Sequence, residues 1–135
     1  MFKSLDETVH IAPQITLDQL DAAKAAGITT VISHRPDNEE PGQMSFATLK
    51  AEAEARGLTA HHIPMVPGQF TPSHVEAFKQ ATGDCDGKVL AFCRSGMRAS
   101  MLWALSKKGE MSAAEIMGCC QKAGFDVSPL AAHLG

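Results

Sequence analysis

The sequence has no apolar run long enough to cross a bilayer, and its first residues lack the apolar segment of a secretory signal. It also lacks a strong excess of charge, since the formal net charge is −3 and 20% of the residues are charged. This balance does not indicate nucleic acid or an anionic membrane surface as a partner. We therefore expect a cytoplasmic protein that binds neither.

Cysteines are few, and their spacing lacks the pairs that are typical of zinc sites. The four are Cys85, Cys93, Cys119 and Cys120, and the sequence has no Cys-x2-Cys or His-x3-His pair. We expect no metal, no cofactor, and reduced thiols rather than disulfides. The adjacent Cys119 and Cys120 are predicted to be small core residues of a helix. The alternative is that one of them is a redox or sulfur-accepting partner of Cys93.

What the sequence does contain is a regular alternation of strand and helix patterns. Strands are predicted at 9–12, 28–33, 58–63 and 88–92. Helices are predicted at 16–27, 45–57, 71–82, 101–109 and 112–123, with a last short helix within 125–134. The side chains of Thr16, Ser45 and Ser112 are predicted to cap the starts of three of these helices. This order predicts an α/β fold in a single domain over residues 1–135, with a central, mostly parallel sheet of four to five strands flanked by helices.

Three loops follow predicted strands on the same side of this sheet. They cover residues 34–43, 64–70 and 93–98. Ligands of parallel α/β sheets bind beyond the carboxyl ends of the strands. The three loops are therefore predicted to converge on one site.

The loop at 93–98 carries the strongest chemical signal. Cys93 ends a buried strand and precedes a helix, so backbone N–H groups and the helix N-terminus favour its thiolate form, which is the nucleophile. The guanidinium of Arg98 can hold a tetrahedral oxyanion. A structural buried cysteine would explain Cys93 alone, but not its neighbours. We predict Cys93 and Arg98 to be catalytic, with substrate contacts from Arg94, Ser95, Gly96, Met97 and Ala99.

Several segments resemble a known group of proteins. Residues 31–37, 62–64 and 89–96 follow the order found in dual-specificity protein phosphatases. Residues 35–43 and 93–96 are more similar to the bacterial phosphatase-like domain that is fused to, or encoded near, beta-lactamase-fold hydrolases. The resemblance covers nearly the whole chain. It implies a cysteine-phosphatase fold with Cys93 as nucleophile and Arg98 as oxyanion ligand.

The chain departs from the phosphatase pattern in three places. Four residues separate Cys93 from Arg98, where cysteine phosphatases have five, and this spacing is similar to that of rhodanese-type sulfurtransferases. The loop at 64–69 has no carboxylate, although many cysteine phosphatases use an upstream aspartate as general acid. Ala99 stands where phosphatases place Ser or Thr, and Ser100 follows one residue late.

The loop at 34–43 holds the residues that could replace the missing acid or contact substrate. The candidates are His34, Arg35 and Asp37, with Glu39 and Glu40 as further acids. The alternatives are structural. Arg35 would form an ion pair with Glu39 or Glu40 that stabilises the loop, and Asp37 would cap the loop's own backbone.

Two reactions and one binding role are compatible with this pattern. The whole-chain resemblance narrowly favours hydrolysis of a phosphomonoester through a cysteinyl-phosphate intermediate. The alternative is a rhodanese-like sulfurtransferase that forms a persulfide on Cys93 and passes it to a thiol or persulfide acceptor. The third hypothesis is a non-catalytic domain that binds a small oxyanion or a partner, because fold alone does not determine reaction.

Overall fold

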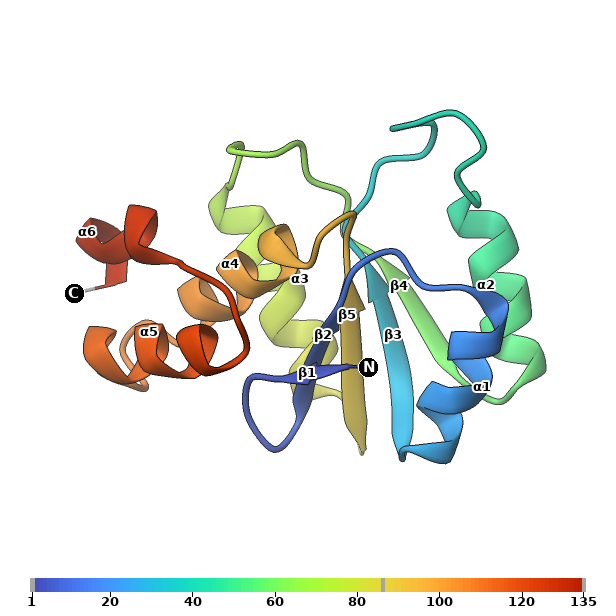
Figure 1. Cartoon of the computed structure of the whole chain (residues 1–135), viewed down its shortest axis with the longest axis horizontal. Helices are drawn as coiled ribbons and strands as arrows, with labels where there is room; N and C mark the ends of the chain where they lie inside the picture. Colours follow the sequence, from blue (N-terminus) through green and yellow to red (C-terminus); the bar gives the residue numbers. More distant parts are fainter. Residues whose placement is uncertain (1, 86, 135) are drawn as a thin grey trace.

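The computed structural model describes residues 2–85 and 87–134. Its sheet has five strands in the order β1-β2-β5-β3-β4 (Figure 1). The strands are β1 (Lys3–Ser4), β2 (Val9–Ala12), β3 (Ile28–Ser33), β4 (Thr59–His62) and β5 (Lys88–Phe92). β1 pairs antiparallel with β2, and the other pairs are parallel. The predicted α/β class and mostly parallel sheet are confirmed, while the short strand β1 was not predicted.

Helices cover both faces of the sheet. They are α1 (Leu17–Ala25), α2 (Phe46–Ala55), α3 (Pro72–Gly83), α4 (Met97–Ser106), α5 (Ala113–Lys122) and α6 (Ala131–Leu134), with a 3-10 turn η1 (Ser128–Leu130) before α6. In Figure 1, α1 and α2 lie on one side of the sheet, and α3, α4, α5 and α6 lie on the other. The predicted caps at Thr16, Ser45 and Ser112 each accept a backbone hydrogen bond.

The start of α4 differs from the prediction. The helix begins at Met97 rather than at Met101, so Met97 and Arg98, the last two residues of the predicted loop, lie in its first turn. Gly96 is the N-cap and has a φ of 96°. Glycine adopts this left-handed conformation without the steric penalty that other residues meet. Arg98 therefore lies on a rigid helical turn rather than on a flexible loop.

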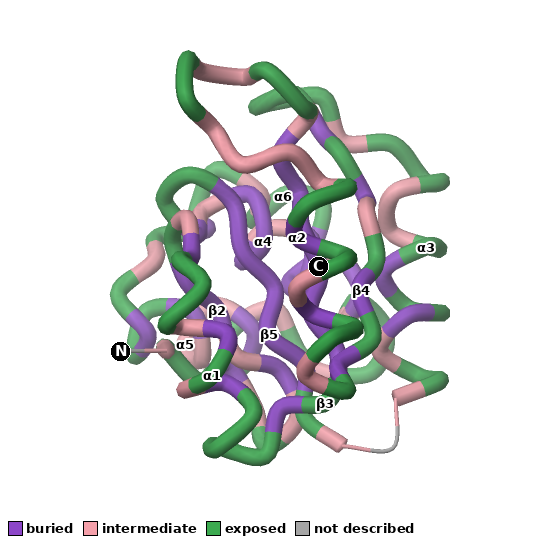
Figure 2. Tube along the Cα trace, turned by 90° about the vertical axis from the view of Figure 1, so that its right-hand side faces the viewer, coloured by how far each residue is buried: buried purple, intermediate pink, exposed green. Residues whose placement is uncertain are grey.

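The sheet separates two hydrophobic clusters because strand side chains point alternately to its two faces. One cluster lies under α1 and α2 and includes Leu20, Val31, Leu49, Leu90 and Phe92. The other lies under α3, α4 and α5 and includes Ile32, Phe78, Ala91, Leu102, Trp103 and Ile116. Figure 2 shows the buried trace running along the central strands and α4. The turn that holds Arg98 is thus anchored on the second cluster.

The adjacent cysteines of α5 belong to the same cluster. Cys120 is fully buried, and Cys119 is half-buried against the cluster. Burial, with the charge of Cys119 as a smaller cause, raises the pKa of Cys120 to about 12. Cys120 is therefore a neutral core thiol at physiological pH, in line with the prediction.

Residues 2–85 and 87–134 lack two features that would point to a membrane or a metal. No helix there is both long and apolar enough to span a bilayer. No three His, Cys, Asp or Glu side chains in the same residues lie close enough together to hold a metal ion.

Candidate active site

Cys93 lies directly after β5, at the carboxyl end of the sheet, and its side chain is fully buried. Its Sγ accepts a hydrogen bond of 3.0 Å from the backbone N–H of Gly96. The turn that brings this N–H to the sulfur is held by Ser100, whose Oγ donates to the carbonyl of Gly96 at 2.9 Å. The sulfur therefore lies at the N-terminus of α4, with a backbone N–H directed at it.

The three predicted loops meet at Arg98. Its Nη1 donates to the carbonyl of Met65 at 2.8 Å and to that of His34 at 3.4 Å. Met65 belongs to the loop after β4, and His34 directly follows β3. The predicted convergence of the loops at 34–43, 64–70 and 93–98 is therefore confirmed.

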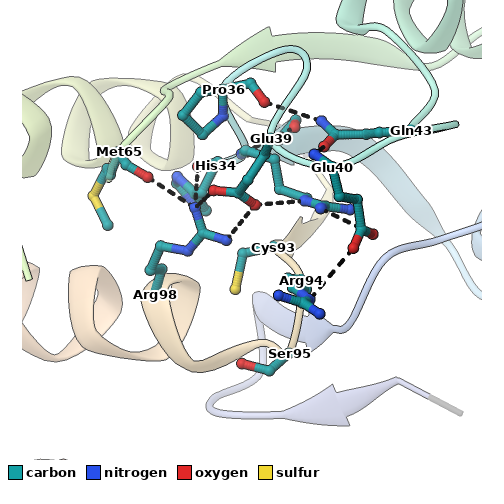
Figure 3. A network of polar contacts seen from close by, with 12 residues as sticks. His34, Pro36, Glu39, Glu40, Gln43, Met65, Cys93, Arg94, Ser95 and Arg98 are labelled. Carbon is teal, nitrogen blue, oxygen red and sulfur yellow. Dashed lines mark hydrogen bonds and ion pairs between the residues drawn. The ribbon is translucent and has the colours of Figure 1, made fainter. Parts of the chain in front are cut away.

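Glu39 binds the guanidinium of Arg98 through both carboxylate oxygens (Figure 3). Nη1 of Arg98 lies 2.7 Å from Oε2, and Nη2 lies 2.8 Å from Oε1. Hydrogen bonds from Arg98, and then from Arg35, hold the pKa of Glu39 below its usual value despite partial burial. Burial acts to lower the pKa of Arg98, but the hydrogen bonds to Glu39 and the charge of the Cys93 sulfur raise it overall. The pair is ionised at neutral pH.

Arg35 is fully buried and supports the first loop. Its Nε donates to Glu39 at 2.8 Å, and its Nη1 donates to Oε1 of Gln14 at 2.7 Å. Its Nη2 lies 3.1 Å from Glu40, whose second oxygen lies 3.6 Å from Nε of Arg94. These contacts are the ion pairs with Glu39 and Glu40 that the structural alternative for Arg35 predicts. Because Glu40 also pairs with Arg94, they connect the first loop to the Cys93 loop.

His34 and Asp37 are occupied in ways that limit them as acids. His34 is buried, and its Nδ1 lies 3.0 Å from the carbonyl of Ile63, while its Nε2 has no partner among the described residues. Burial, the largest cause, lowers the pKa of His34 to about 4. The imidazole is therefore neutral at physiological pH. Oδ1 of Asp37 accepts a hydrogen bond of 2.8 Å from the backbone N–H of Phe46, so Asp37 caps the approach to α2.

A cleft of about 400 Å³ lies beside the Cys93 loop. Its lining includes Arg94, Ser95, Met97 and Arg98 from the loop and the first turn of α4. Its other lining residues are Pro67, Gly68, Phe70, Met101, Pro129 and Leu130. The predicted contact residue Ala99 lies elsewhere, because its side chain is fully buried in the hydrophobic core. Gly96 is buried and contributes its N–H to Sγ.

The contact between Glu39 and Arg98 was not predicted from the sequence. Glu39 was considered as an acid or as a partner of Arg35, and both Arg35 and Arg98 turn out to bind it. Charge complementarity between the loops could have indicated this contact. The loop at 34–43, with two adjacent carboxylates, was predicted to face the loop at 93–98, with two arginines.

The sheet topology, the strand–loop–helix at Cys93 and the arginine on the first turn of α4 define a domain with the architecture of cysteine phosphatases. Residues 1–110 match the family model described as "Beta-lactamase hydrolase-like protein, phosphatase-like domain". The chain belongs to this family, which confirms the resemblance inferred from the sequence.

Relatives and solved structures agree with this assignment. A beta-lactamase hydrolase-like protein of Xylella fastidiosa is 33% identical over 125 residues, which are 91% of this chain and 29% of that protein. A Neisseria meningitidis structure named a "putative phosphatase" is 36% identical with a TM-score of 0.87, covering 98% of this chain and 94% of that one.

A more distant structure shares the fold alone. It is a kinase-associated phosphatase with its catalytic-site cysteine replaced by serine, 13% identical with a TM-score of 0.76, covering 98% of this chain and 88% of that one. Taken together, these likenesses support an enzyme of the phosphatase type. The chain spans less than a third of the curated relative that it matches.

Proposed function

We propose that this phosphatase-fold domain is a sulfurtransferase in which Cys93 accepts a sulfane sulfur and passes it to a thiol. One observation carries the proposal. The described residues that line the cleft beside Cys93 include no Asp, Glu or His. A reaction in this cleft therefore needs a leaving group that departs without a proton from the protein.

The acids of the first loop do not fill this gap. Glu39 is ionised and bound to two arginines, and Glu40 pairs with Arg35 and Arg94. Asp37 caps a backbone N–H, and His34 is neutral and buried. Glu39 lacks the proton and His34 lacks the exposure that a general acid requires, while Asp37 and Glu40 are held by other partners and do not line the cleft.

Sulfur transfer needs no such acid. The Cys93 thiolate attacks the outer sulfur of thiosulfate, a Sγ–S bond forms, and sulfite leaves with the electron pair of the broken S–S bond. An acceptor thiolate then attacks the terminal sulfur of the persulfide and releases the Cys93 thiolate. The N–H of Gly96 stabilises negative charge at Sγ, and the exposed Arg94 is placed to attract the anionic donor.

The short loop supports the same reaction. A persulfide needs hydrogen-bond donors around sulfur atoms, whereas a phosphoryl group needs a ring of donors around three oxygens. Four residues between Cys93 and Arg98 offer fewer N–H groups than the longer phosphatase loop. Arg98 also carries a bidentate carboxylate, which an oxyanion would have to share or displace.

A second candidate is hydrolysis of a phosphomonoester through a cysteinyl-phosphate intermediate. It is favoured by the family description and by the 36% identical structure named a "putative phosphatase". Without a general acid, this reaction would be limited to good leaving groups such as phenolates. Alkyl phosphates would react more slowly by a factor of about 10² to 10⁴.

Two assays separate these reactions. The protein is incubated with thiosulfate and cyanide, and separately with p-nitrophenyl phosphate, each with Cys93→Ser and with Cys119→Ser as the matched control. We expect thiocyanate from the unchanged protein and from Cys119→Ser and none from Cys93→Ser. With thiosulfate alone, without cyanide, we expect a mass gain of one sulfur atom on Cys93.

The other outcomes have defined meanings. Nitrophenol release without thiocyanate would establish the phosphatase candidate and overturn sulfur transfer. No turnover in either assay, with anion binding that survives in Cys93→Ser, would identify the non-catalytic domain.

A further inference from the structure

The cleft beside the Cys93 loop adjoins a second cavity along α4. This second cavity has a volume of about 580 Å³. The two cavities share Gly68, Phe70 and Leu130 in their linings, so they lie side by side, and we treat them together as one groove. In Figure 1 the segment before α3, helix α4 and the segment that includes η1 and α6 lie on the same side of the sheet. We call this feature the α4 groove.

The floor of the α4 groove is an apolar stripe on α4. Met97, Met101 and Leu105 line it, are four residues apart, and are each half-buried. Residues at this spacing lie on one helix face, and the rise per residue makes the stripe about 12 Å long. The stripe starts at the catalytic turn and leads away from it.

Apolar side chains also line the groove beside this stripe. Phe70 and Leu130 line both cavities, and Val75 lines the farther one. Charged side chains line the groove as well, with Arg94 and Arg98 beside the loop and Glu76, Lys108 and His133 in the far cavity. Where the two cavities meet, Phe70 and Leu130 offer contact to hydrocarbon.

We propose that the α4 groove binds the unbranched aliphatic chain of a thiol or persulfide substrate, with its sulfur at Cys93 and its chain over Met101 and Leu105. The proposal rests on Cys93 being the reactive group. Continuity with the Cys93 loop assigns the groove to the substrate. The two methionines suit a flexible chain, because their own side chains adapt to irregular contacts.

Chain-length dependence of Cys93 labelling tests the groove. The reagents are methyl, butyl, hexyl and octyl methanethiosulfonate. The thiolate attacks the sulfenyl sulfur, a Sγ–S bond forms, and methanesulfinate leaves with the electron pair. The rate at Cys93 is followed by mass spectrometry of the modified peptide and divided by the rate of free cysteine with the same reagent.

We expect the normalised rate to rise with chain length. Full burial of one methylene group corresponds to about a four-fold change in affinity, and an open groove covers only part of each group. The octyl reagent should therefore label Cys93 at least about ten-fold faster than the methyl reagent. Cys93 is buried, so labelling includes an opening step, but that step is common to all reagents and cancels in the ratio.

Two variants locate the effect. Leu130→Ser and Leu105→Ser remove apolar surface from two sides of the groove, and both should reduce the octyl-to-methyl ratio several-fold. The matched control is Leu17→Ser, an exposed leucine on α1 across the sheet, which should keep the full ratio. Thermal unfolding checks that each variant is folded.

A ratio near one for the unchanged protein would overturn the groove proposal, as would a lack of labelling by any reagent. Equal loss of the ratio in Leu17→Ser would overturn it too. A ratio near one is independent of the proposed reaction, whereas no labelling at all would count against Cys93 as the reactive group in both proposals. Thiocyanate formation without chain-length dependence would contradict only the groove proposal. Chain-length dependence without thiocyanate would contradict only the proposed sulfur transfer.

Discussion

Glu39 compensates two buried arginines with a single carboxylate. Its oxygens accept hydrogen bonds of 2.7 to 2.8 Å from Arg35 and Arg98, and its side chain is 20% exposed. Removing one partner of a buried ion pair leaves an uncompensated charge, which destabilises far more than the pair itself stabilises. Glu40 offers a natural comparison, because it pairs with Arg35 and Arg94 but is 39% exposed.

Replacing Glu39 with Gln should therefore affect both stability and anion binding. We expect Glu39→Gln to lower the free energy of unfolding by about 2 kcal/mol and Glu40→Gln by less than about 1 kcal/mol. Added sulfate should raise the Tm of Glu39→Gln more than that of the unchanged protein, because the anion replaces the lost carboxylate at Arg98. Urea titration and thermal unfolding with and without sulfate measure both effects. Equal responses of the two variants would show that Arg98 does not depend on Glu39.

At the scale of elements, the turn into α4 depends on a position that only glycine fills well. Gly96 has a φ of 96°, and a Cβ atom there would lie 2.8 Å from Cζ of Phe125 and 3.1 Å from Cγ2 of Ile11. Gly109 has a similar φ of 87°, but no atom lies within 4 Å of its Cβ position. The two glycines share the backbone requirement and differ in the surrounding space.

This difference separates backbone strain from steric conflict. Gly109→Ala should lower the free energy of unfolding by about 1 kcal/mol, the cost of the left-handed conformation. Gly96→Ala should lower it by about 3 kcal/mol, because the overpacking at Phe125 adds to the same strain. Urea denaturation compares the two. Gly96→Ala should also slow labelling of Cys93 by methyl methanethiosulfonate, since the N–H that faces Sγ shifts. If Gly96→Ala were as stable as Gly109→Ala, the side chain of Phe125 would be able to move away from the added methyl group without a cost in stability.

An element can be predicted from the sequence when the residues that determine its ends are close together in the sequence. Thr16 and Ser112 mark helix starts through side-chain caps that are local in sequence, and both were predicted. The sequence prediction placed the start of α4 four residues late. Gly96 forms no side-chain cap, and its left-handed φ cannot be read from the sequence. Strand β1 is two residues long and exists only through its pairing with β2.

At the scale of the whole molecule, topology predicted the place of the site but not its polar network. Because ligands of parallel sheets bind beyond the carboxyl ends of the strands, the three loops were predicted to converge. The hydrogen bonds of Arg98 to His34 and Met65 confirm that convergence. The bond between Glu39 and Arg98 joins residues 59 positions apart, and its geometry depends on side-chain directions that sequence patterns do not encode. The α4 groove likewise depends on how the carboxyl-terminal segment packs over α4.

The stability of the whole fold should depend on pH through His34. The usual pKa of this side chain is 6.5, and burial lowers it to about 4 in the folded state. Between these values the unfolded chain binds a proton that the folded chain does not, so the free energy of unfolding falls as the pH is lowered. The loss from His34 alone should reach about 3 kcal/mol at pH 4. Below the usual pKa of Glu39, protonation of that carboxylate acts in the same direction, because its folded pKa is also lowered.

Urea titrations at several pH values between about 4 and 7 measure this slope. His34→Gln should flatten it, because glutamine can still donate to the carbonyl of Ile63 and does not titrate in this range. The matched control is His61→Gln, on the exposed side of β4, which should retain the slope of the unchanged protein. A slope that persists in His34→Gln would place the pH dependence elsewhere in the fold, and His34 would then be protonated within its buried site. That result would also reopen His34 as a proton donor and weaken the argument for a reaction without a general acid.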